Sequence, residues 1–177
     1  MTARDLSGEQ RRVARGMAGA LLTAIGVLAT VAFMDRQAAT PPFANRLQFA
    51  VRADLFVAIW LGAAIANVAR LRFFSARDIA ADPATPPSDN VRAARAMLQN
   101  TTEQVGLAIV THLIVAATFD RSNALVVALV CLFTVGRALF WAGYRHGASR
   151  RAFGFALTFY PSLLALLASA VALPFTR

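Results

Sequence analysis

Polar side chains interrupt an apolar stretch near the middle of the chain. Gln99, Asn100, Glu103 and Gln104 come directly before the apolar run of residues 105–119. Asn100 and Glu103 are three residues apart, so a helix places them on one face, with Gln104 beside them. At membrane depth, an unpaired glutamate requires a cationic partner or the ammonium group of a ligand. The alternative is a structural cluster that joins helices by hydrogen bonds.

Arg137 lies inside a second apolar stretch, residues 135–140. Arginine stays protonated in proteins and therefore needs a carboxylate, a phosphate or water nearby. Glu103 is the obvious partner within the chain. Phe140 and Tyr144 follow at three and seven residues, on the same helix face as Arg137. This face offers a cation, an aromatic wall and a phenol, or else an Arg137–Glu103 pair with Tyr144 as an interfacial aromatic residue.

A basic connector leads into the last apolar stretch, with Arg145, His146, Arg150 and Arg151. The N-terminus of the helix behind it adds partial positive charge, which favours an anion or a thiolate at this place. The alternative is a charged loop that faces lipid headgroups.

Metal chemistry has no visible ligand set. His112 lies at mid-membrane depth, where it can hydrogen-bond another helix, and His146 is the only other histidine. Cys131 is the only cysteine, which excludes a disulfide scaffold. We therefore predict no metal site.

Composition indicates what kind of element must carry these residues. The chain has 177 residues, of which 58% are hydrophobic and 15% charged, and its mean hydropathy is +0.55. This apolar content excludes disorder. The net charge is +9, and every basic residue is an arginine. Long apolar runs separate these arginines, which argues against a nucleic-acid binder. We predict one small integral membrane protein.

The apolar runs predict five membrane-spanning helices, each near the ~20 residues that cross a bilayer. Four of them cover residues 16–34, 54–69, 124–144 and 152–173, and the third in chain order begins inside the helical stretch of residues 91–103 and continues through residues 105–119. The first is interpreted as an uncleaved anchor because it is longer than the apolar core of a signal peptide. Residues 35–53 form a connector with Pro41 and Pro42, and residues 75–90 form a proline-bearing loop.

The distribution of arginine predicts the orientation. With five spans, one side receives Arg4, Arg11, Arg12, Arg15, Arg70, Arg72, Arg77, Arg92, Arg95, Arg145, Arg150 and Arg151. The other side receives Arg36, Arg46, Arg52, Arg121 and Arg177. The positive-inside rule places the first set in the cytoplasm, with the N-terminus inside and the C-terminus outside.

Over residues 54–173 the chain resembles the MAPEG superfamily (membrane-associated proteins in eicosanoid and glutathione metabolism). The resemblance rests on two segments, residues 95–104 with an Asn-x-x-Glu pair after arginines, and residues 136–144 with an Arg seven residues before a Tyr. We therefore predict an all-α integral membrane fold. A four-helix MAPEG-like bundle (residues 54–177) follows a tail, an extra transmembrane helix and a connector (residues 1–53).

The resemblance also implies a site. Known members are trimers that bind glutathione between subunits, towards the cytoplasmic face. By this resemblance Asn100, Glu103, Arg137 and Tyr144 bind glutathione, and Arg151 is the catalytic arginine that stabilises its thiolate. Arg95 is a further binding candidate, one position before the arginine of other members, where this chain has an alanine.

The first functional hypothesis is a glutathione-dependent transferase or peroxidase for lipophilic electrophiles. Its expected setting is a homotrimer in a bacterial-type inner membrane, in contact with lipids and a lipophilic small molecule and with no nucleic acid. The second is a non-catalytic membrane module whose polar cluster only holds subunits together. A small transporter has less support because the sequence shows no repeat.

Overall fold

The computed structural model describes residues 3–37, 39–80 and 84–175, and these residues form helices and loops with no strand. The six α-helices are α1 (Ala3–Met34), α2 (Phe43–Ala53), α3 (Leu55–Phe73), α4 (Asp89–Thr118), α5 (Asn123–Gly143) and α6 (Ala148–Ala172). Three single 3₁₀ turns follow α1, α5 and α6, at Asp35–Gln37, Tyr144–His146 and Leu173–Phe175. The predicted all-α fold is confirmed.

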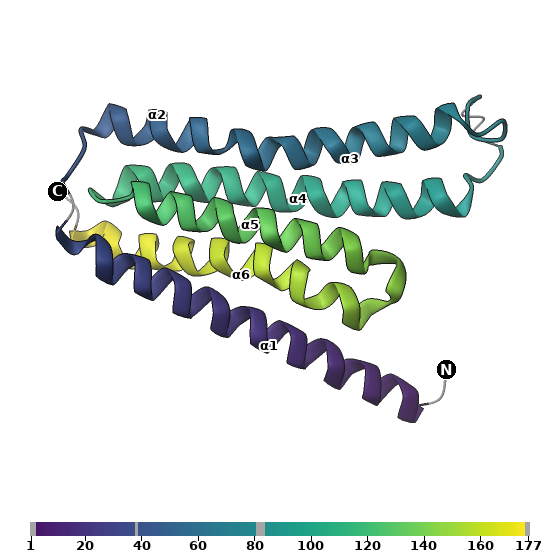
Figure 1. Ribbon diagram of the computed structural model, residues 1–177, viewed down its shortest axis with the longest axis horizontal. Coiled ribbons are helices and arrows are strands. Elements are labelled where there is room, and N and C mark those ends of the chain that lie inside the picture. The colour runs from purple at the N-terminus through teal and green to yellow at the C-terminus, as the bar shows by residue number, and fades with distance from the viewer. Residues whose placement is uncertain (1–2, 38, 81–83, 176–177) are drawn as a thin grey trace.

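The long helices lie side by side along one direction, and α2 continues almost straight into α3 (Figure 1). The start of α1, the α3–α4 loop and the α5–α6 connection lie at one end, which we call the arginine-rich end (Figure 1). The α1–α2 connection, the α4–α5 turn and the end of α6 lie at the opposite end. The chain therefore crosses the bundle five times, as the apolar runs predict.

Four segments are long and apolar enough to cross a membrane within the described residues. They are Leu6–Met34, Phe43–Phe73, Asn123–His146 and Ala148–Phe175. The fifth predicted span, α4, has 30 residues. It is less apolar than these four segments, because Gln99, Asn100, Glu103 and Gln104 lie near its middle. The chain is a multi-pass membrane protein with an extra N-terminal helix beside a four-helix bundle.

The prediction that residues 35–53 form a connector is wrong for residues 43–53, because these residues form helix α2 (Phe43–Ala53). Pro42 precedes the first helical residue with φ −54° and ψ 150°, a position where proline needs no donor. Arg46 of α2 is buried and donates to the Ala116 carbonyl at 3.2 Å and to Asp120 at 2.6 Å. It thereby satisfies a carbonyl at the C-terminus of α4, so this arginine does more than set topology.

Helices α5 and α6 pack closely because glycines face each other. A Cβ atom on Gly136 would lie 2.7 Å from Thr158 and 2.9 Å from the Gly154 carbonyl. A Cβ atom on Gly154 would lie 2.7 Å from the Gly136 carbonyl. This close approach brings Arg137, the residue after Gly136, within reach of α6.

Helix α1 is the outermost helix, and it is attached to α6. Only 11% of its most apolar window is buried, against 50% for α5. Ala20 packs against Ala156 and Leu157 of α6. Glu9 accepts a hydrogen bond from the Ser149 amide at 2.9 Å. No side chain at the N-cap of α6 serves this amide group, so α1 caps α6 from outside.

Candidate functional site

Arg137 is fully buried in the interior of the bundle. Its guanidinium donates to the Asn100 amide oxygen at 2.9 Å and to the Thr158 hydroxyl at 2.8 Å. The side chain therefore joins α4, α5 and α6. The expected Arg137–Glu103 pair is wrong, because Glu103 is exposed on α4 and accepts a hydrogen bond from Gln99 at 2.8 Å.

Aromatic rings replace a carboxylate beside this cation. The Arg137 guanidinium lies 4.4 Å from the centre of the Phe140 ring and 5.9 Å from that of Phe133. A desolvated cation–π contact is worth about 2 kcal/mol. The Arg137 Nε group has no hydrogen-bond partner among the described residues. Arg137 is thus a buried cation held by dipoles and rings.

A pocket of about 320 Å³ lies next to this cluster. Its lining includes three of the predicted site residues, Asn100, Tyr144 and Arg151, together with the aromatic rings of Phe140 and Phe155. The structure therefore gathers groups from α4, from the 3₁₀ turn after α5 and from α6. Arg137 is not part of the lining and reaches the pocket through Asn100.

Arg151 and Tyr144 contact each other at the arginine-rich end of this pocket. The Arg151 guanidinium lies 4.9 Å from the centre of the Tyr144 ring, and Tyr144 packs edge-to-face on Phe140 at 5.4 Å. Arg151 belongs to the first turn of α6. The partial positive charge of that turn adds to the guanidinium, so an anion in the pocket would meet both.

The other two predicted site residues lie elsewhere. Arg95 and Glu103 are exposed on α4, and neither is part of the lining of this pocket. Their binding roles stay predictions. Their exposure leaves them accessible to a ligand or to a neighbouring chain.

Sequence reasoning missed Thr158, Phe155 and two residues of α1. Thr158 holds Arg137, and a hydroxyl within an apolar span is a signal that points to such a role. Val13 and Met17 of α1 form one wall of the pocket. No local signal distinguishes these two from lipid-facing residues, because only the packing of α1 places them there.

A second buried polar pair joins α4 to the junction of α2 and α3. The His112 Nδ1 atom lies 2.5 Å from Asp54 Oδ1, and both side chains are buried. The expectation that His112 bonds to another helix is confirmed. The sequence indicates Asp54 only as the first residue of the second span and not as the partner of His112. No group of three or more potential metal ligands occurs in the described parts of the chain.

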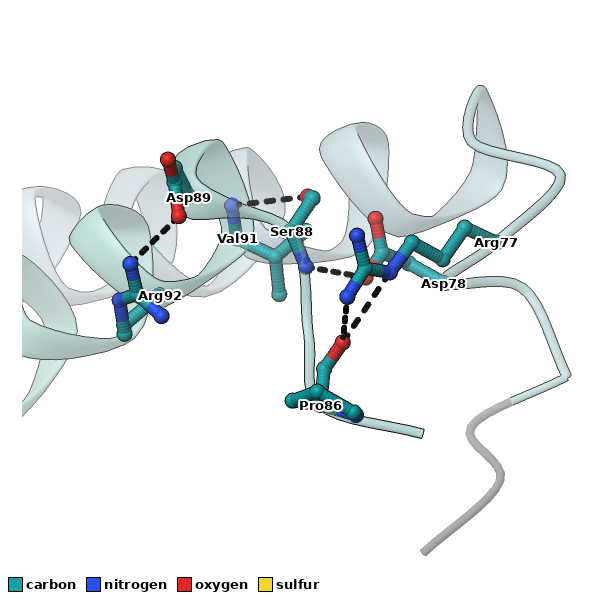
Figure 2. Close-up of polar contacts among 7 residues, drawn as sticks. All are labelled: Arg77, Asp78, Pro86, Ser88, Asp89, Val91 and Arg92. Atoms are coloured by element: carbon teal, nitrogen blue, oxygen red, sulfur yellow. Dashed lines mark hydrogen bonds and ion pairs between the residues drawn. The ribbon is translucent and has the colours of Figure 1, made fainter. Parts of the chain in front are cut away.

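The α3–α4 loop fixes the start of the helix that carries Asn100 (Figure 2). Asp78 accepts from the Ser75 hydroxyl at 2.6 Å and from the Ser88 amide at 2.9 Å. These hydrogen bonds lower the pKa of Asp78 to about 2. Ser88 in turn caps α4, accepting from the Val91 amide. Arg77 closes the loop by donating to the Pro86 carbonyl at 2.6 Å.

Comparison with known proteins adds one finding. A family model described as the MAPEG family matches residues 47–171, a range that runs from α2 to the end of α6 and includes all six predicted site residues. No curated protein and no solved structure matches the chain.

Proposed function

The chain belongs to the MAPEG family, and from this premise we propose that it is a membrane-bound, glutathione-dependent transferase or peroxidase acting on lipophilic electrophiles. The proposed setting is a homotrimer in a bacterial-type inner membrane, with the arginine-rich end in the cytoplasm. The observation that carries the proposal is the pocket where Asn100, Tyr144 and Arg151 meet beside two phenylalanine rings.

The chemistry of this pocket fits the tripeptide. Glutathione carries two carboxylates, an ammonium group and a thiol. The pocket offers the Arg151 cation, the Tyr144 hydroxyl and the Asn100 amide as polar groups in an otherwise apolar lining. Its volume of about 320 Å³ lies at the lower end of the range for small-molecule sites, about 300–1,000 Å³.

Bound glutathione would supply a thiol, and its thiolate form is the nucleophile towards an electrophilic carbon or a peroxide oxygen. Arg151 and the first turn of α6 favour the thiolate because both place positive charge at the same position. Stacking on Tyr144 fixes the direction of the Arg151 guanidinium. Phe140 and Phe155 offer an apolar surface for the lipophilic substrate.

Arg137 acts as a positioning residue in this scheme. Its hydrogen bond fixes the oxygen of Asn100, so the amide NH₂ group of Asn100 is the part left to donate to a ligand. Arg95 and Glu103 lie on the exposed face of α4. In a trimer this face would meet a neighbouring subunit, where both could complete a shared site.

The test is glutathione conjugation to a model electrophile by the full chain in detergent, with a peroxide as the second substrate. Arg151→Ala should lose activity by a factor of about 100 or more, the range for removal of one electrostatic stabiliser. Arg150→Ala is the matched control, since Arg150 is exposed and lies outside the pocket. No binding and no turnover in the wild type at millimolar glutathione would exclude the enzyme.

One observation favours the non-catalytic module as a second candidate. The two side-chain hydrogen bonds of Arg137 join α5 to α4 and α6, which gives this residue a structural role that needs no ligand. Under this alternative glutathione leaves the melting temperature unchanged, and Glu103→Gln disrupts assembly. A saturable rise in melting temperature with glutathione would contradict it.

A further inference from the structure

Helix α1 forms one wall of the pocket beside Arg151. Val13 and Met17 of this helix belong to the pocket lining, together with residues of α4, α5 and α6. Helix α1 packs on α6 and runs in the same direction, starting from the arginine-rich end (Figure 1). It lies outside the family match of residues 47–171, so membership of the family assigns it no role at the site.

Three contacts fix the position of this wall. Glu9 accepts a hydrogen bond from the Ser149 amide at 2.9 Å. A Cβ atom on Gly16 would lie 3.4 Å from the backbone nitrogen of Phe153, so the two helix backbones come close together there. Ala20 is fully buried in a cluster with residues of α6. Because these contacts span three turns of α1, α1 and α6 stay in register along the pocket.

This register gives the order of groups from the arginine-rich end inwards. Arg151 and Val13 both fall between the Glu9 contact and the Gly16 contact along their helices. Met17 and Phe155 follow four residues later, which is about one turn deeper in the bundle. The pocket therefore changes from a cation at its outer end to apolar side chains at its inner end. An electrophile whose reactive carbon meets a thiolate beside Arg151 would extend its apolar part towards Met17.

We propose that α1 determines which lipophilic electrophiles the pocket accepts, with Met17 in contact with the apolar chain of the substrate. The inference rests on the proposed function, because it concerns the second substrate of the same pocket. Methionine suits this role, since its unbranched side chain adapts to apolar partners of different shape. The volume of about 320 Å³ is small for a ligand site, which favours a slender, unbranched chain.

The test compares two electrophiles that differ only in chain length, trans-2-hexenal and trans-2-dodecenal. The thiolate sulfur of glutathione bonds to the β-carbon of the alkenal and the α-carbon takes up a proton, so glutathione is the only co-reactant. With the full chain in detergent, Met17→Ala should raise the KM for dodecenal about three- to tenfold. The KM for hexenal should stay unchanged, because the shorter chain does not reach Met17.

Leu22→Ala is the matched control for this truncation. Leu22 is 70% exposed on α1 and lies outside the pocket lining, so its loss should change neither KM. Met17→Trp fills the inner end of the pocket and should abolish conjugation of dodecenal while hexenal is still conjugated. Ala18→Trp, exposed on α1 and outside the lining, should leave both reactions intact.

Thermal melting with and without glutathione checks each variant, because Met17 also packs against the α1–α6 cluster. An unchanged, saturable rise in melting temperature shows that the variant is folded and that its glutathione site is intact. Loss of this rise in both Met17→Ala and Met17→Trp would overturn the inference, since Met17 would then support the whole site and not select the second substrate.

The remaining outcomes separate this inference from the proposed function. If the wild type conjugates the alkenals while Met17→Ala matches Leu22→Ala and Met17→Trp matches Ala18→Trp, the role of α1 is wrong and the proposed function stands. Equal losses for hexenal and dodecenal would also overturn the role of α1. No conjugation of either alkenal by the wild type overturns the inference, and a wild type that also fails to bind glutathione overturns the proposed function with it.

Discussion

The guanidinium of Arg137 is held by the amide oxygen of Asn100, the hydroxyl of Thr158 and the ring of Phe140. A buried ion carries a desolvation cost of several kcal/mol, and a carboxylate is the usual compensation. Since the carboxylate is replaced by neutral groups here, the cluster keeps its full positive charge. A positive site next to a pocket attracts anions, which a neutral Arg–Glu pair would not do.

This arrangement predicts that removing the partner of the buried cation lowers stability more than removing the cation itself. Asn100→Ala leaves the buried cation with one hydrogen bond fewer and should lower the free energy of unfolding by about 1.5–3 kcal/mol. Arg137→Met removes the cation together with its desolvation cost and should lower it by less, about 1 kcal/mol at most. Chemical denaturation in detergent measures both.

The double variant separates this explanation from simple loss of packing. Once Arg137 is methionine, Asn100→Ala should cost almost nothing further, since the Asn100 amide would have lost its buried partner. If Arg137→Met instead costs more than Asn100→Ala, Arg137 is chiefly a structural link between the helices, as in the non-catalytic alternative.

Residue types and spacing were sufficient to find the polar groups but not their partners. Asn100, Arg137, Tyr144 and Arg151 could be selected because charge and hydrogen-bonding groups are rare in apolar spans. The Arg137–Glu103 pairing was wrong because a helical spacing of three tells which residues are near each other, not which of them faces the interior. Only packing decides that Asn100 turns inward and Glu103 outward.

At the scale of elements, the contact between α5 and α6 places Arg137 beside Thr158. Gly154→Ala would put a Cβ atom 2.7 Å from the Gly136 carbonyl, so the helices must separate. We expect a loss of about 1–3 kcal/mol in unfolding free energy, as for other overpacked sites. Gly106→Ala in α4 is the control, because no atom of another helix lies within 4 Å of its Cβ position. It should be neutral or stabilising by up to ~1 kcal/mol.

Loss of the α5–α6 contact should also be visible at the site. Gly154→Ala should weaken glutathione binding, if the proposed function holds, through displacement of Arg151 and Phe155 on α6. Equal melting temperatures for Gly154→Ala and Gly106→Ala would contradict the packing argument directly.

The α3–α4 loop has a pH dependence with a defined sign. The folded-state pKa of Asp78 is lowered to about 2, below the ordinary value near 3.9 for an unfolded chain. The carboxylate therefore contributes stability above pH ~4, and this contribution is lost as the pH falls from ~4 towards 2. The stability difference between wild type and Asp78→Asn, measured against pH, should be constant near neutrality and vanish near pH 2.

Ser75→Ala tests the cause of that pKa shift. Removing the hydroxyl that donates to Asp78 should raise the pKa of the carboxyl and move the loss of stability to higher pH. An Asp78 titration that is the same with and without the Ser75 hydroxyl would show that another group lowers the pKa.

Elements with a strong apolar signal were predictable to within a few residues, and those that depend on long-range contacts were not. Helices α5 and α6 begin close to the expected residues 124 and 152. Helix α2 was missed because its apolar content is modest and two prolines precede it, and its burial depends on Arg46 reaching the end of α4. The glycine contact between α5 and α6 could not be predicted, because the sequence alone does not show that these two helices pack against each other at Gly136 and Gly154.

At the scale of the whole molecule, the arginines separate by end. The start of α1, the end of α3 and the α5–α6 connection lie at the arginine-rich end, and the α1–α2 connection and the α4–α5 turn lie at the other (Figure 1). Arg11, Arg72 and Arg145 belong to the first group of segments, and Arg36 and Arg121 to the second. The charge asymmetry and the helix count are independent properties of the sequence. They agree only if α4, the most polar of the long helices, also crosses the membrane.

The crossing of α4 is therefore the step on which the orientation depends. A polar first half would be costly in contact with lipid, but in α4 Thr101 and Gln104 are buried against other helices and Asn100 is bonded to Arg137. We predict that a fluorescent protein fused to the N-terminus folds in the cytoplasm of a bacterial host. Alkaline phosphatase fused after Arg177 should be active outside it, and after Gly147 inactive. Activity after Gly147 with none after Arg177 would mean that α4 does not cross if the N-terminal fusion is fluorescent, and that the orientation is reversed if it is not. Activity or inactivity at both positions would mean that α6 does not cross.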